Sequence, residues 1–88
     1  MDVLRFPKNV VFREEPDGGL LFNVDTGDMR FVEALACSIC RMIDGGCSRA
    51  GILSELAKRY PGQPAATLES DLDEFLGQLR ESRMLVSG

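Results

Sequence analysis

Three cysteines supply the most reactive side chains of this 88-residue sequence. Cys37 and Cys40 have CxxC spacing, and Cys47 follows shortly afterwards. Thiolates held this close together can bind a metal ion or an iron–sulfur cluster. However, the sequence contains no histidine that could complete a ligand set, and free cysteine commonly packs in protein cores as a small apolar residue. We therefore expect the three cysteines to have packing roles, with no metal and no cofactor.

Carboxylates are the second group of candidate functional side chains. Four of them crowd positions 69–74, namely Glu69, Asp71, Asp73 and Glu74. Such a run is usually the solvated face of a helix, but it also forms a negative rim that would favour a ligand carrying lysine or arginine. No nucleophile lies at a defensible spacing from a general base, and histidine, the usual base, is absent. We therefore expect a protein that is not an enzyme.

The backbone of residues 28–32 is the third candidate, because an exposed strand edge presents a row of unpaired donors and acceptors. Polar and apolar residues alternate in this stretch, as they do in a half-buried strand. Met29 and Phe31 share one face, and we expect Phe31 to lie in the core. Immediately afterwards the apolar residues recur at helical spacing. The strand therefore runs directly into a helix whose packing holds it, and we hypothesise that its free edge is functional.

Two further strands are predicted before this one. Residues 10–14 and 20–24 are rich in β-branched and aromatic side chains, and each stretch is followed by a glycine-containing turn. In the second of these strands we expect Leu20, Phe22 and Val24 to face together. The three strands then form an antiparallel meander, which is too small to close into a barrel and leaves an edge strand exposed.

Three helices are predicted after the sheet, over about 33–44, over 49–59, and from 67 for about four turns. Ser48 and Thr67 are good N-cap residues for the second and third helices. The third helix carries the apolar stripe Leu68, Leu72, Phe75, Leu76 and Leu79. We expect Leu72, Phe75 and Leu79 to pack in the core, and Leu68 and Leu76 to line a groove.

These elements predict a single α+β domain over residues 1–88, a winged helix-turn-helix-like fold in which a three-stranded antiparallel sheet is followed by three helices. Residues 1–9 have no clear period, so we expect either a flexible arm or the lead into the first strand. No apolar run approaches the roughly 20 residues that span a bilayer, and the N-terminus lacks the order of a signal peptide. We therefore expect a cytoplasmic protein.

The order and spacing of these residues resemble the PqqD-like family over roughly residues 10–85. The positions similar to the family's "Leu-Asn, Ala, Ile-Leu, Leu, Asp-Gly" string are Val32-Glu33, Ala36, Ile39, Met42 and Asp44-Gly45. The helices continue the pattern with Ser48, Ile52, Leu56 and Tyr60, then with Asp71-Leu72, Phe75-Leu76 and Leu79. Glu33 stands where the family usually has asparagine, and Cys40 where it has a larger apolar residue, which favours a divergent member.

The resemblance implies a RiPP recognition element, which binds the leader segment of a ribosomally made precursor peptide and presents it to a modifying enzyme, often a radical-SAM protein of the SPASM type. It also implies that the leader adds a strand in a groove between the third strand and the third helix. The implied peptide-binding residues are Asp28, Met29, Arg30, Phe31, Val32, Leu68, Asp71, Leu72, Phe75, Leu76 and Leu79.

A winged-helix nucleic-acid-binding protein is the alternative interpretation, because the order of elements permits it. The net charge of −4 and the acid-rich third helix argue against it, since a phosphate backbone would be repelled. We therefore expect no nucleic-acid partner and no membrane partner. The oligomeric state stays open between monomer and homodimer, because an exposed strand edge can pair with a second copy.

Overall fold

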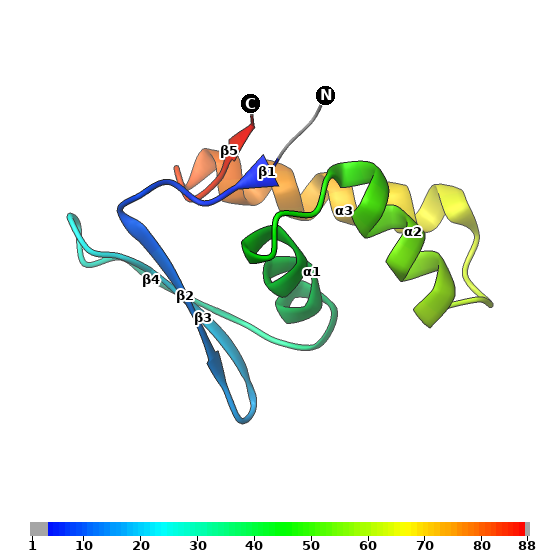
Figure 1. Ribbon diagram of the computed structural model, residues 1–88, viewed down its shortest axis with the longest axis horizontal. Helices are drawn as coiled ribbons and strands as arrows, with labels where there is room; N and C mark the ends of the chain where they lie inside the picture. The colour runs from blue at the N-terminus through cyan, green and yellow to red at the C-terminus, as the bar shows by residue number, and fades with distance from the viewer. Residues whose placement is uncertain (1–3, 88) are drawn as a thin grey trace.

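The computed structural model describes residues 4–87, in which the three predicted strands and three predicted helices follow in the predicted order, with an additional two-residue strand near each end of the described chain (Figure 1). The elements are β1 (Leu4–Arg5), β2 (Val10–Glu15), β3 (Gly18–Asn23), β4 (Met29–Val32), α1 (Ala34–Asp44), α2 (Arg49–Arg59), α3 (Ala65–Glu81) and β5 (Val86–Ser87). β2, β3 and β4 form one antiparallel sheet in that order. This confirms the predicted α+β class, with a three-stranded antiparallel sheet followed by three helices.

The sheet has one covered face and one open face. On the covered face Leu21 is fully buried, and Gly19 lets the sheet approach α1 closely: a Cβ atom there would lie 2.6 Å from the Phe12 ring and 3.2 Å from the Cys37 Sγ. The apolar residues Leu20 and Phe22 do share a face, but it is the open one, because Leu21 between them points into the core, whereas Val24 lies in the turn after β3.

Phe31 also lies on the open face, with 54% of its surface exposed, so the expectation that it belongs to the core is wrong. Its neighbour Val32 is the buried residue of β4. The reason is the period of two: one β4 face meets the helices through Arg30 and Val32, which places Phe31 on the other face.

The helices begin at residues that satisfy their first backbone donors. Ser48 caps α2 as predicted, because its Oγ accepts a hydrogen bond from the Gly51 N–H at 3.1 Å. α3 begins earlier than predicted, with Pro64 at the cap position and the Pro64 carbonyl accepting from the N–H of Thr67 at 3.1 Å. Proline is tolerated at the start of a helix because the N–H that it lacks would have no partner there. Thr67, the predicted cap, therefore lies within the first turn of α3.

α3 supplies the longest apolar stripe to the core. Leu68, Leu72, Leu76 and Leu79 are all buried, and they belong to one apolar core cluster that also includes residues of the sheet and of both other helices. Cys37 and Cys40 are buried in α1 within the same cluster, and Cys47 is partly buried beside it. The cysteines therefore have the packing roles that their composition predicts.

The two ends of the described chain lie side by side (Figure 1). β1 pairs with β5, with Leu4 opposite Ser87 and Arg5 opposite Val86, and Leu4 is 1% exposed. Of the arm expected at residues 1–9, residues 1–3 lie outside the described residues, while residues 4–9 carry this strand and the approach to β2. Among residues 4–87, no helix has the length and apolarity needed to cross a bilayer.

Candidate functional site

The outer edge of β4 is the first component of the site. A hydrogen bond of 2.8 Å from the Asn23 N–H to the Asp28 carbonyl identifies which residue pairs bond across β3 and β4. In this register, the backbone groups of Arg30 point toward β3. Those of Met29 and Phe31 point away from it, to an edge that no other described strand pairs with. The edge therefore offers backbone donors and acceptors at alternate residues.

A buried asparagine fixes the start of this strand. The Asn23 Oδ1 accepts from the N–H groups of Asp25 at 2.9 Å and Thr26 at 3.2 Å, and the Asn23 carbonyl accepts from the Gly27 N–H at 2.8 Å. Gly27 has a φ of 82°, a conformation that glycine adopts without strain. The turn is thereby closed on itself, which sets the direction in which β4 leaves it.

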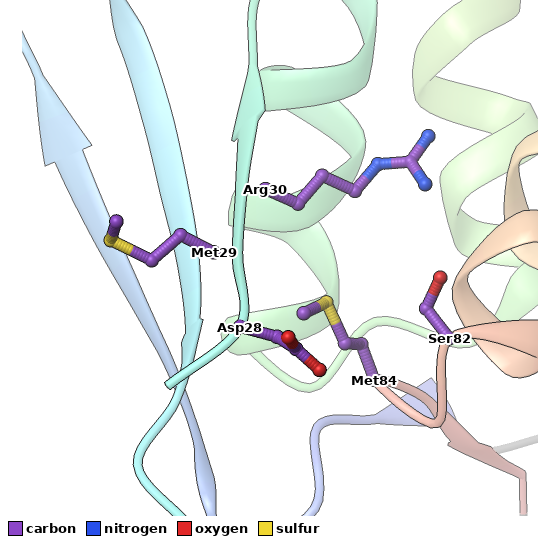
Figure 2. A pocket seen from close by; sticks show the side chains of 5 residues that line it. All are labelled: Asp28, Met29, Arg30, Ser82 and Met84. Carbon is purple, nitrogen blue, oxygen red and sulfur yellow. The ribbon is translucent and has the colours of Figure 1, made fainter. Parts of the chain in front are cut away.

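Arg30 connects β4 to α3 across the middle of the site. Its guanidinium donates to the Gln78 Oε1 at 2.6 Å and lies 5.7 Å from the centre of the Phe75 ring. Figure 2 shows Arg30 and Met29 leaving the strand on opposite sides, with Arg30 directed toward α3. Arg30 thus bridges β4 and α3, and its charge lies between these two elements.

Two pockets lie on either side of the Arg30 bridge. The first, of about 340 Å³, lies between the start of β4 and the end of α3 (Figure 2); its lining residues are Asp28, Met29, Arg30, Ser82 and Met84. The second, of about 220 Å³, lies where α1 and α3 begin; its lining residues are Ala34, Leu35, Tyr60, Gln63, Leu68 and Asp71. The pockets lie toward opposite ends of α3 with the Arg30 bridge between them, and we call this stretch of surface the groove.

The acidic run of α3 is divided between two surfaces. Arg49 of α2 forms a bidentate pair with Asp73, with both N–O distances at 2.8 Å, and its guanidinium lies 3.6 Å from Glu69. The hydrogen bond from Arg49 holds the pKa of Asp73 below its usual range. Asp71 lines the second pocket instead. The negative rim of the groove is therefore smaller than four carboxylates would make it.

The thiols do not form a reactive centre. Burial raises the pKa of Cys40 to about 12, and the neighbouring Cys37 acts in the same direction. The part of the chain that the structure describes contains no cluster of cysteine and carboxylate side chains arranged to hold a metal ion. At neutral pH the Cys40 thiol is protonated and unsuited to act as a nucleophile or ligand.

The structure places the predicted site residues in three locations, one of which is the open face of the sheet, where Met29 and Phe31 expose their side chains. Asp28, Arg30, Leu68, Asp71 and Phe75 lie at the groove or its pockets. Val32, Leu72, Leu76 and Leu79 are instead buried in the core. The expected assignment is thus wrong for Leu76, which is fully buried. Phe75, expected in the core, is only partly buried at its edge, and the Arg30 guanidinium lies over its ring.

Gln78 and Ser82 also lie along the groove, although neither residue was among the predicted peptide-binding residues. They extend the helical row that begins with Asp71 and Phe75, at spacings of three or four residues. That row is mixed in polarity, so an apolar stripe does not reveal it. Arg30 alternates with Met29 and Phe31, so it lies on the side of β4 that faces the helices. A charged residue on that side indicates that the helix opposite it carries polar residues.

Comparison with known proteins identifies relatives at the level of family and fold. A family model described as "Coenzyme PQQ synthesis protein D (PqqD)" matches residues 18–85. No curated protein matches the sequence. The structure "TbiB1 in Complex with the TbiA(beta) Leader Peptide" is 23% identical, with a TM-score of 0.86 over 92% of this chain and 93% of that one. "Lasso peptide synthetase B1 complexed with the leader peptide" is 19% identical, with a TM-score of 0.84 over 94% and 96%.

Proposed function

Because the chain belongs to the PqqD family, we propose that it is a non-catalytic cytosolic adaptor, which binds the leader segment of a ribosomally made precursor peptide and presents it to a modifying enzyme. The observation that carries this proposal is the open β4 edge beside a groove that ends in two pockets. Both similar structures are described as complexes with leader peptides, which supports a peptide as the ligand.

The leader adds a strand to β4 by hydrogen bonding to the backbone groups of Met29 and Phe31. Strand addition takes its affinity from main-chain hydrogen bonds and its specificity from pockets that receive alternate side chains. From Leu68 to Ser82 the groove follows about 21 Å of α3. An extended peptide of about six or seven residues covers that length.

The charges along the groove favour a particular leader. Asp28 lies at one pocket and Asp71 at the other, whereas the Arg30 guanidinium lies between them. A leader with lysine or arginine near both ends of the bound segment, and an acidic or amide side chain at its centre, complements this order. Glu69 and Asp73 contribute less, because both lie close to Arg49.

The enzyme that receives the peptide supplies the chemistry. Membership of the PqqD family favours a radical-SAM enzyme of the SPASM type. The description of one similar structure as a lasso peptide synthetase favours an enzyme of lasso-peptide synthesis as the second candidate. In either pathway the adaptor contributes proximity and orientation of the substrate, since holding reactants together removes part of the entropic barrier.

An amide-shift titration of the labelled protein tests the proposal. The ligand is the leader segment of a precursor encoded beside the gene, and DNA of similar length serves as the comparison. We expect shifts at residues 28–32 and along the groove side of α3, with a micromolar or tighter dissociation constant. Absence of shifts with every neighbouring leader would overturn the adaptor function, and salt-dependent shifts with DNA would support the winged-helix alternative.

A further inference from the structure

The open face of the sheet carries an apolar patch across all three strands. Two cross-strand rows form it: Val11, Phe22 and Met29 in one, and Leu20 and Phe31 in the other, which ends on β2 at the charged Arg13. Met29 is 65% exposed, Phe31 is 54% exposed and Val11 is 44% exposed. An antiparallel sheet that has water on one face normally places polar side chains there. An apolar face in that position marks an interaction surface.

We infer that this open-face patch is the docking surface for the modifying enzyme, and that the bound leader completes it. The inference rests on the proposed function, and its structural basis is that β4 belongs to both surfaces. Arg30 faces the groove while Met29 and Phe31 face the patch, so a strand added at the β4 edge has the same alternation. Half of the leader's side chains then extend the patch by one strand.

The size of the patch favours this occupant over a second copy of the chain. Five apolar side chains, three of them about half exposed, offer on the order of 400 Å². A stable interface buries about 800 Å² on each partner. The patch alone is therefore too small for a lasting face-to-face dimer. An added leader strand supplies more of the required area, and the enzyme consequently binds the loaded adaptor more tightly than the free one.

Val11 provides a test that is separate from leader binding. It lies on β2, two strands away from the β4 edge, so its side chain does not reach the added strand. A lysine at this exposed edge-strand position is compatible with folding. The variant Val11→Lys places a charge in the patch, and Ala57→Lys places the same charge at an exposed position of α2 as the matched control.

The experiment measures binding of the purified modifying enzyme encoded beside the gene, by calorimetry, with and without the leader of the neighbouring precursor. We expect the leader to strengthen enzyme binding at least tenfold, Val11→Lys to weaken it by about tenfold, and Ala57→Lys to leave it unchanged. Leader affinity stays constant in both variants. Equal enzyme affinity of Val11→Lys and the unsubstituted chain would overturn the inference.

Two further outcomes separate this inference from neighbouring ones. Failure of the unsubstituted chain to bind the leader would overturn the proposed function itself. Sedimentation of the chain alone as a dimer that Val11→Lys dissociates would overturn enzyme docking and assign the patch to a second copy. If the leader binds but Val11→Lys does not change the affinity for the enzyme, the docking surface is wrong while the adaptor function is retained.

Discussion

At the scale of single residues, Ala34 at the start of α1 combines backbone strain with a position at the second pocket. Ala34 opens the helix with a φ of 51°, and its side chain lines the second pocket. The left-handed conformation costs about 1 kcal/mol or more for a residue with a Cβ atom. Backbone strain of this kind commonly marks ligand sites, and here it lies where the strand becomes a helix without a linker.

Glycine at position 34 relieves this strain. We expect Ala34→Gly to raise the free energy of unfolding, by less than about 1 kcal/mol because glycine also loses more entropy on folding. The matched control is Ala57→Gly at an exposed position inside α2, which costs about 1 kcal/mol. Urea denaturation measures both. A destabilised Ala34→Gly variant would contradict the strained conformation.

The Cys40 thiol makes stability depend on pH. Its pKa lies at about 12 in the folded protein, because of burial, against an ordinary value of 9.0. The folded state thus keeps a proton that the unfolded chain releases, so this stabilisation is complete below pH 9 and is lost as the pH rises toward 12. We expect Cys40→Ala to flatten the pH dependence of unfolding between pH 9 and 12. Parallel curves for Cys40→Ala and the unsubstituted chain would contradict this.

At the scale of elements, alternate residues of β4 direct their backbone N–H and C=O groups to opposite edges of the strand. Arg30 bonds to β3, while Met29 presents its N–H to the open edge. Proline is tolerated on an edge strand where its missing N–H would face solvent. The strand can therefore lose an edge donor without losing its place in the sheet.

Met29→Pro tests strand addition with the fold preserved. We expect leader affinity to fall about tenfold, because one main-chain donor is lost and a leader carbonyl is left unpaired. Met29→Thr keeps the N–H and removes the same side chain, so it is the matched control for the backbone effect. Calorimetric titration with the leader measures both variants, and equal affinity of the two would exclude a hydrogen bond at this N–H.

At the scale of the whole molecule, the pairing of β1 with β5 joins the two ends of the described chain beside the core. Leu4 is almost completely buried, whereas Arg5 beside it is exposed. Met84 and Leu85, which precede β5, are also buried. The segment after α3 is therefore held near the first pocket, to which Met84 contributes.

Leu4→Ala measures what this closure contributes. We expect it to lower the free energy of unfolding by about 2–5 kcal/mol, as for other buried leucines. Arg5→Ala, which alters an exposed neighbour on the same strand, should change stability by less than about 0.5 kcal/mol. Chemical denaturation checks the difference. Equal, small changes in the free energy of unfolding for the two substitutions would show that the pairing of β1 with β5 contributes little to stability.

Local patterns in the sequence were sufficient to predict the three strands of the main sheet, the three helices and the Ser48 cap. The alternation of residues 28–32 also separated Arg30 from the face that Met29 and Phe31 share. Such signals act through the backbone of one turn or one strand. They do not depend on how the elements pack.

Only the tertiary structure decided which side of each element is buried and which side chains meet. Phe31 lies on the open face, and Leu76 in the core, because of how β4 and α3 are turned toward the other elements. Arg30 meets Gln78, which is 48 positions away in the sequence. Periodicity groups residues on a common face but does not choose the face that packs. That choice is made by contacts between distant segments, which also create the groove and the apolar patch.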